Sequence, residues 1–143
     1  MSADEHSHDS WVRTVRLPFT TESVPEVRQA VREDLAGSQV PADVIEETET
    51  VVSELVANAI LHGRPLPDGT VRVHWKVRPP RIELEVSDGG GERHPVPKPQ
   101  VPWAASGRGL RIVRSLAHEW GVADEDGRTT VWAAMGGPSR RRL

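Results

Sequence analysis

Cysteine is absent from this chain, and so are long hydrophobic runs and any excess of positive charge. Without cysteine, disulfides and thiolate metal sites are excluded. No apolar stretch approaches the roughly 20 residues that a helix needs to cross a bilayer. A formal net charge of −3 argues against a general nucleic-acid-binding protein, because such proteins carry basic surfaces. We therefore expect a cytoplasmic protein with neither a membrane nor a direct nucleic-acid partner.

The length of 143 residues predicts a single domain with a core of its own. Residues 1–10 are polar, so we expect a disordered leader rather than a secretory signal. The folded domain is expected over residues 11–136. Residues 137–143 are predicted to form a basic tail, whose three arginines are typical of a solvated chain end.

Hydrophobic periodicity divides the domain into helices and strands. Ser23 is the expected N-cap of the first helix, and Gly63 and Gly121 are expected to end the second and third. The Pro79-Pro80 link favours an antiparallel hairpin. The predicted strands are 11–17, 70–78, 81–87, 122–123 and 129–135, and the predicted helices are 24–36, 41–62 and 109–120. This order predicts an α/β fold: a two-layer α/β sandwich with helices on one face of a mixed, mostly antiparallel sheet.

Three polar residues of the second predicted helix, Glu54, Asn58 and His62, are spaced four apart and share roughly one face. They border an apolar stripe, where a polar side chain costs free energy unless something pairs with it. A hydrated Mg²⁺ ion with a triphosphate would be such a partner, because Mg²⁺ prefers oxygen ligands and takes few of them from protein. The ordinary alternative is a hydrogen-bonded Glu and Asn at the edge of a core.

Asp88 stands where an apolar strand ends and three glycines begin. Glycine permits positive φ and lets a flat ligand approach the backbone closely. An aspartate at this position can accept a hydrogen bond from an exocyclic amino group, such as N6 of adenine. The alternative is an ordinary turn, because Asp-Gly is a common turn signal.

A second glycine-rich segment, Ser106-Gly107-Arg108-Gly109-Leu110, directly precedes a predicted helix. Unpaired N–H groups and the positive end of the helix dipole make such a segment a natural phosphate cradle. Arg108 could reach a γ-phosphate. A simple helix entry capped by Ser106 is the alternative, since the segment is neither a Rossmann fingerprint nor a P-loop.

In this order, these segments resemble the nucleotide-binding boxes of the gyrase, heat-shock chaperone, histidine kinase and MutL (GHKL) ATPase superfamily. Within it, the chain looks like the small anti-sigma-factor serine kinases of the RsbW and SpoIIAB type. The resemblance runs from about Trp11 to Met135 and implies the Bergerat ATP-binding fold. The matching segments are 52–59 with 62–63 for the N box, 86–90 and 107–117 for the two glycine boxes, and 127–132 for the closing strand.

The resemblance implies a role for each matching residue. Glu54 would be the catalytic general base that takes the proton of a substrate serine, and Asn58 would bind Mg²⁺. Asp88 would hold the adenine amino group of ATP. The other implied contacts are Gly90 and Thr130 near the base, and Gly107, Arg108, Gly109 and Leu110 on the phosphate side.

The resemblance implies an ATP- and Mg²⁺-dependent anti-sigma-factor serine kinase that binds a sigma factor, phosphorylates a STAS-type anti-anti-sigma protein and forms a homodimer. The glycine box departs from the family pattern at Glu92, and a proline-rich segment follows. This favours the alternative of a partner-switch module that binds nucleotide with little kinase activity. A detached sensor-kinase domain has the weakest support, because His62 lies inside the N-box helix. Four arginines are either partner contacts or solvated charges: Arg13, Arg16, Arg28 and Arg32.

Overall fold

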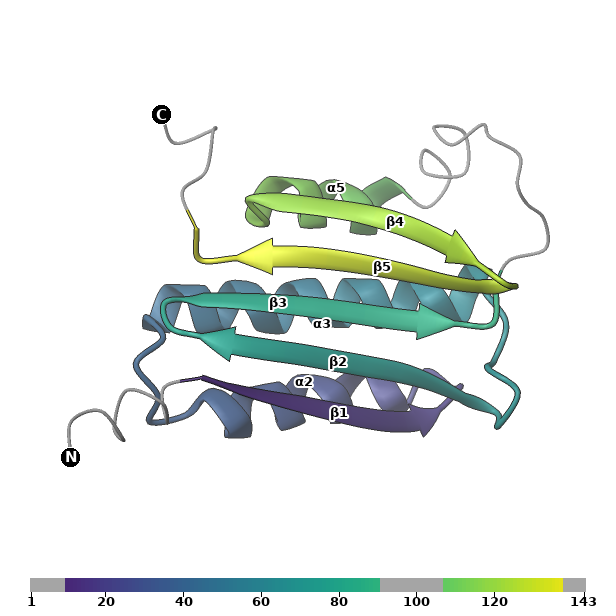
Figure 1. Ribbon diagram of the computed structural model, residues 1–143, viewed down its shortest axis with the longest axis horizontal. Helices are drawn as coiled ribbons and strands as arrows, with labels where there is room; N and C mark the ends of the chain where they lie inside the picture. The colour runs from purple at the N-terminus through teal and green to yellow at the C-terminus, as the bar shows by residue number, and fades with distance from the viewer. Residues whose placement is uncertain (1–9, 91–106, 138–143) are drawn as a thin grey trace.

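A computed structural model describes residues 10–90 and 107–137, with side chains for 10–90 and 111–137 (Figure 1). The predicted leader and tail, the proline-rich segment and Glu92 lie almost entirely outside these ranges. The side chains of Arg108 and Leu110 lie outside them too. Within the described part, none of the helices combines the length and apolarity that a membrane span requires.

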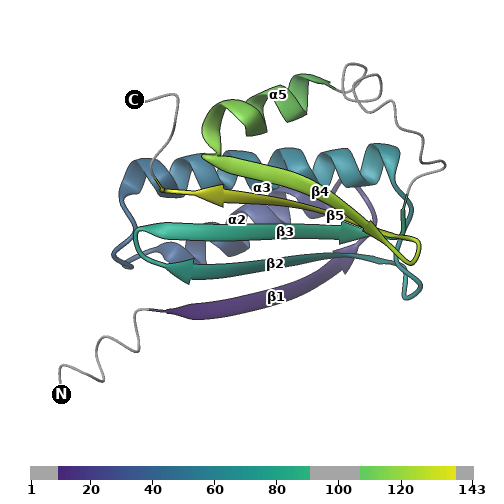
Figure 2. The same cartoon turned by 45° about the horizontal axis from the view of Figure 1, so that its top comes forward.

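The predicted element order is confirmed. The elements are β1 (Trp11–Pro18), α2 (Ser23–Leu35), α3 (Ala42–His62), β2 (Thr70–Arg78), β3 (Arg81–Asp88), α5 (Gly107–Leu116), β4 (Glu119–Glu125) and β5 (Arg128–Met135). The strands form one sheet in the order β1-β2-β3-β5-β4, and all four pairings are antiparallel rather than mixed. The helices cover one face, and α3 runs along the middle of the sheet (Figures 1 and 2). The molecule is therefore a two-layer α/β sandwich.

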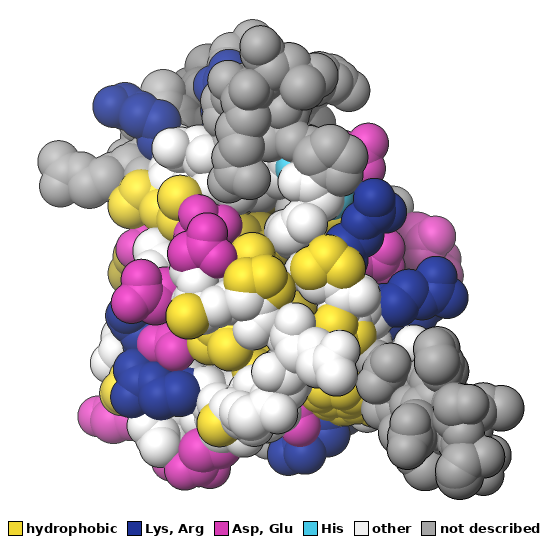
Figure 3. Space-filling model, turned by 90° about the vertical axis from the view of Figure 1, so that its left-hand side faces the viewer, with side chains coloured by type: hydrophobic (Ala, Val, Ile, Leu, Met, Phe, Trp, Pro, Cys, Tyr) yellow, Lys and Arg dark blue, Asp and Glu magenta, His cyan; other side chains and the backbone are white. Residues whose placement is uncertain are grey.

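The core lies between the two layers because strand residues alternate between faces. β2 buries its four inner residues, and the predicted apolar stripe of α3 is buried opposite them. Trp75 is the largest fully buried side chain among the described residues. Seen from the end on the left of Figure 1, apolar side chains gather in the middle and most charged ones lie around them (Figure 3). The buried core residues of these two elements are Val71, Val73, Trp75 and Val77 of β2, and Val51, Val52, Leu55 and Val56 of α3.

A carboxylate joins α2 to the sheet. Asp34 Oδ2 accepts hydrogen bonds from the indole Nε1 atoms of Trp11, at 2.8 Å, and Trp75, at 2.7 Å. Arg13 reaches its Oδ1 at 3.0 Å. Trp75 can therefore be fully buried, and Trp11 half-buried, against α2 without an unsatisfied N–H.

A second carboxylate joins α2 to α3. Glu49, which is 7% exposed, lies 2.9 Å from Arg32 Nη2 and 3.5 Å from Arg28 Nε. The Arg32 guanidinium lowers the pKa of Glu49. On the surface, Arg16 of β1 pairs with Asp68, which precedes β2, at 3.0 Å. All four arginines considered as partner contacts therefore have partners inside the fold.

Several predicted boundaries are wrong, among them the start of the first helix and the end of the third. Ser23 is not the N-cap of the first helix, because Glu22 takes that position and the Ser23 hydroxyl instead donates to Pro18 O at 2.6 Å. The third helix ends at Leu116, so Gly121 lies inside β4 rather than after a helix. A Cβ at Gly121 would lie 2.8 Å from the indole of Trp132 on β5, so glycine there makes room for the ring.

Candidate nucleotide-binding site

Three segments far apart in the sequence meet where β3 ends. The backbone N–H of Gly89 donates to Arg64 O at 2.6 Å, just beyond the end of α3. A Cβ on Gly90 would lie 2.7 Å from Gly127 O in the β4–β5 turn. The end of β3 is therefore held between the end of α3 and the β4–β5 turn, on the right of Figure 1.

Asp88 is buried at this meeting point, with 5% of its surface exposed. A Cβ on Gly63 would lie 2.6 Å from Asp88 Oδ2, so only glycine allows the end of α3 to come so close. Burial raises the pKa of Asp88 to about 6. The N–H of Gly90 opposes this rise, and the negative charge of Asp124 adds to it. The carboxylate is poorly compensated for a buried charge.

The ordinary-turn interpretation of this segment is partly correct. Asp88 Oδ1 accepts the N–H of Gly90, two residues on, at 2.7 Å, which is the local bond that Asp makes in turns. A surface turn, however, does not require a carboxylate to be buried. The burial of Asp88 and its raised pKa therefore favour the ligand-binding interpretation.

On α3, Glu54 and Asn58 are half-buried and His62 is exposed. Neither Glu54 nor Asn58 makes a side-chain hydrogen bond within residues 10–90 and 111–137. Glu49 on the same helix is buried and paired with two arginines. The expected alternative, in which Glu54 and Asn58 are satisfied at the edge of the core, is therefore not seen in the described part.

Asn58 lies four residues, about one helical turn, before His62, the last residue of α3. The next residue, Gly63, lies against the side chain of Asp88. The described residues include no cluster of three or more His, Cys, Asp or Glu able to hold a metal ion. A magnesium ion at Asn58 would therefore need phosphate oxygens and water for most of its ligands. Mg²⁺ is usually bound in this way beside nucleotides.

The structure separates Thr130 from Asp88. Thr130 pairs with Ser87 across the strands, and their hydroxyl oxygens lie 2.8 Å apart. Ser87 precedes Asp88, so this pair lies on the outer face of the sheet, away from the helices. The residue opposite Asp88 on the inner face is Thr129. Thr129, rather than Thr130, therefore shares the face of Asp88, and the role of Thr130 near a base stays a prediction.

Thr129 and Asp124 lie beside Asp88 at this candidate site and were not among the predicted residues. Thr129 Oγ1 donates to Asp124 Oδ1 at 2.6 Å, and the two residues pair between β5 and β4. The alternation of strand faces provides a signal that could have found Thr129. Val131 and Ala133 are apolar core residues, and counting back in steps of two from them reaches Thr129 rather than Thr130.

The four residues predicted on the phosphate side form the first turn of α5, which begins at Gly107 rather than Gly109. This end of α5 lies toward the same side of the molecule as the end of β3 in Figures 1 and 2. Helix N-termini present free N–H groups that suit phosphate. The placement agrees with the predicted role of Gly107, Arg108, Gly109 and Leu110, which stays a prediction.

These features define a two-layer α/β domain with a candidate ligand site at one end of its sheet. Residues 17–135 match the family model of the histidine kinase-like ATPase domain, so the chain belongs to that family. It is 31% identical over 121 residues to the anti-sigma F factor of Halalkalibacterium halodurans. The alignment covers 78% of this chain and 83% of that protein.

Two solved structures share the fold. The RsbU and RsbW domains of a Mycobacterium tuberculosis protein match with a TM-score of 0.67 and 22% identity, over 91% of this chain but 34% of that longer chain. The SiaB–SiaC complex of Pseudomonas aeruginosa matches with a TM-score of 0.63 and 12% identity, over 94% and 95% of the two chains. At these identities the likeness concerns the fold alone.

Proposed function

We propose that this protein is a cytoplasmic anti-sigma factor that acts as an ATP- and Mg²⁺-dependent protein-serine kinase. It would bind a sigma factor and phosphorylate a STAS-type anti-anti-sigma protein on serine. The observation that carries the proposal is the buried, poorly compensated carboxylate of Asp88. It lies at the end of a helix whose Asn58 and Glu54 have no hydrogen-bond partner in the described part.

The residues around Asp88 suit an adenine ring. The carboxylate offers acceptor oxygens, and the exocyclic amino group of adenine is a donor that would compensate its burial. Gly63 and Gly90 both lie close to Asp88 and have no Cβ atoms, so the backbone can approach a flat ligand closely there. The fit depends on the desolvated acceptor, because a base that offers no donor there would leave the carboxylate unpaired.

Asn58 and Glu54 would serve the phosphate side of the site. Asn58 would hold Mg²⁺ through its side-chain oxygen, together with phosphate oxygens. ATP and its metal, when bound, supply the phosphoryl group and neutralise its charge. Glu54 lies about one turn before Asn58 on α3. Its half-buried carboxylate would accept the proton of a serine hydroxyl presented by the antagonist.

Phosphotransfer tests the role of Glu54. The protein is incubated with Mg²⁺-ATP and a STAS-type antagonist, and phosphoserine is measured by mass spectrometry. Glu54→Gln keeps the size of the side chain but removes the base, so transfer should fall by about 10²-fold or more. Glu46→Gln changes an exposed glutamate of the same helix and should leave the rate unchanged. Undiminished transfer in Glu54→Gln would remove Glu54 from the base role.

One observation supports a second function. Glu92 stands where the family pattern has a glycine, which favours a partner switch that binds nucleotide and sequesters its regulator with little phosphotransfer. The same assay, together with calorimetric titration of ATP, separates the two functions. Tight binding of ATP with no phosphoserine on the antagonist would support the switch. Dimerisation stays a prediction, which analytical ultracentrifugation of the full chain would test.

A further inference from the structure

Three polar residues form a row on the inner face at the site end of the sheet. Asp88 on β3 pairs with Thr129 on β5, and Thr129 pairs with Asp124 on β4. The threonine hydroxyl therefore stands between two carboxylates on neighbouring strands, roughly 5 Å from strand to strand. The negative charge of Asp124 adds to the rise in the pKa of Asp88, which agrees with this closeness.

The direction of one hydrogen bond decides what this row can offer a ligand. A hydroxyl carries a single proton, and Thr129 donates it to Asp124 Oδ1 at 2.6 Å. Toward the site, Thr129 is left with lone pairs only. The Asp88 carboxylate also only accepts when it is ionised. As long as Asp124 holds the threonine proton, the row presents acceptors alone.

We propose that Asp124 is a positioning residue that holds the Thr129 hydroxyl as an acceptor and so selects adenine over guanine nucleotides. The inference rests on the proposed function, because it assumes that the base lies at Asp88. Adenine carries an amino donor at position 6, whereas guanine carries the carbonyl acceptor O6. Guanine would therefore place an acceptor against two others. A site built to receive a donor rejects an analogue that lacks it.

The test measures the affinities of ADP and GDP by calorimetry in the presence of Mg²⁺. Diphosphates avoid turnover, and pH 8 keeps Asp88 ionised. In Asp124→Ala, Thr129 can turn its proton toward guanine O6. The preference for ADP should fall about tenfold, the size of one net hydrogen bond.

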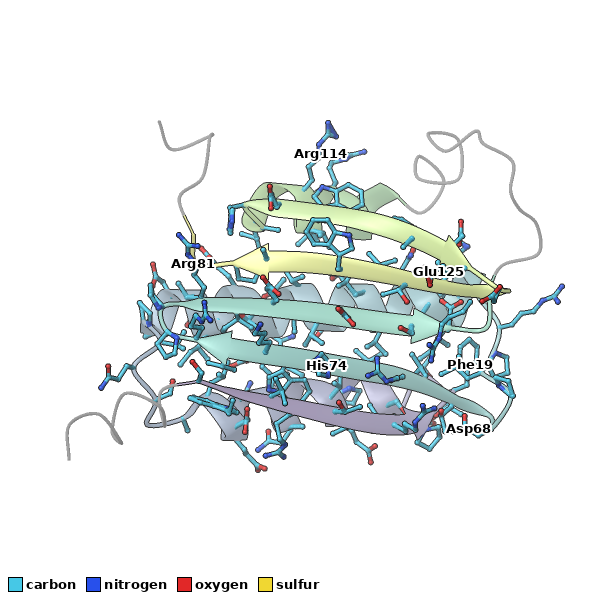
Figure 4. All side chains as sticks on the ribbon, viewed as in Figure 1. Phe19, Asp68, His74, Arg81, Arg114 and Glu125 are labelled. Atoms are coloured by element: carbon cyan, nitrogen blue, oxygen red, sulfur yellow. The ribbon has the colours of Figure 1, made fainter. Side chains whose placement is uncertain are left out.

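A matched control separates the hydrogen bond from the charge. Glu125 is the next residue on β4, lies near the same turn (Figure 4) and faces the other side of the sheet. Glu125→Ala removes an equal charge and should keep the wild-type preference. Thr129→Val removes the hydroxyl itself. Adding Asp124→Ala to Thr129→Val should change the preference no further, because Asp124 would act only through that hydroxyl.

The outcomes distinguish this inference from the function beneath it. An unchanged ADP preference in Asp124→Ala overturns the inference, as does an equal loss in Glu125→Ala. In either case the proposed function stands if Asp88→Asn still weakens ADP binding about 30-fold or more. If the wild-type protein binds no adenine nucleotide, or Asp88→Asn binds it normally, the proposed function fails instead. Circular dichroism verifies that each variant is folded.

Discussion

Glu49 and Asp88 are both buried carboxylates, but they meet opposite environments. Glu49 lies between α2 and α3, where the forked guanidinium of Arg32 lowers its pKa. Asp88 lies at the end of the sheet, where burial raises its pKa to about 6 and its hydrogen bond is to the N–H of Gly90. The charge of Glu49 is paired with arginines of the same fold, whereas Asp88 has no cationic partner among the described residues. Poor compensation of this kind marks a candidate functional site.

The largest effect that would test this comparison is the pH dependence of the free energy of unfolding. Asp88 has a folded pKa of about 6, above its ordinary value of 3.8. Its contribution to stability is therefore fully present below pH 4 and lost as pH rises through 6. The loss should be about 2–3 kcal/mol, allowing for solvent screening. Urea unfolding of wild type and Asp88→Asn between pH 4 and 7.5 would measure it.

Asp88→Asn should remove this fall in stability and leave the variant more stable than wild type at pH 7.5. Glu49 titrates in the opposite sense, because its pKa is lowered: its stabilisation is present above its ordinary pKa and is lost as pH falls. Parallel stability curves for wild type and Asp88→Asn would contradict the assignment of Asp88 as a destabilising buried charge.

The same variant should weaken nucleotide binding. The substitution replaces one carboxylate oxygen of Asp88 with an NH₂ group. This removes the charge and places a donor against the adenine amino group. Affinity for ADP should fall about 30- to 100-fold, or 2–3 kcal/mol. Calorimetric titration with ADP measures the fall. Asp126→Asn, in the exposed β4–β5 turn, changes a nearby aspartate and should bind as wild type does. If both variants bound ADP with the same affinity, the adenine base would lie elsewhere than at Asp88.

Breaking the paired carboxylate should have a smaller effect of opposite sign. Glu49→Gln removes the charge held by Arg32 and Arg28, so we expect a loss of about 1–2 kcal/mol, because both arginines are partly solvated. Chemical denaturation at pH 7.5 measures it. Nucleotide affinity should not change, since Glu49 faces α2 rather than the end of the sheet. A loss of affinity would mean that the two regions are coupled.

The sequence predicted the fold well because its periodicities are clear. The alternation of β2 and the apolar stripe of α3 both lie in the observed core. The boundary between α5 and β4 was missed because apolar residues at helical spacing continue to Trp120. Trp120 pairs with Ala133 of β5, and this tertiary contact outweighs the local helical pattern.

The candidate site was predicted only where local spacing determines it. The polar stripe of Glu54 and Asn58 and the Asp88 turn follow from neighbouring residues. Thr129 was missed because two adjacent threonines differ only in the face they occupy, and a one-residue shift reverses every face of a strand. The partner of Thr129 is Asp124, across the β4–β5 turn, and the direction of their hydrogen bond requires the register of the two strands.

The smallest effect that we expect concerns Asp34, another carboxylate paired within the fold. Asp34→Asn keeps one acceptor oxygen for the indoles of Trp11 and Trp75 but replaces the other with a donor. At least one hydrogen bond should therefore be lost, at about 1 kcal/mol. Thermal unfolding followed by tryptophan fluorescence measures it, with Glu33→Gln on the exposed side of α2 as the control. If Asp34→Asn were more stable than wild type, Asp34 would be a destabilising carboxylate, as Asp88 is expected to be. Hydrogen-bonded partners inside the fold would then no longer distinguish structural from functional carboxylates.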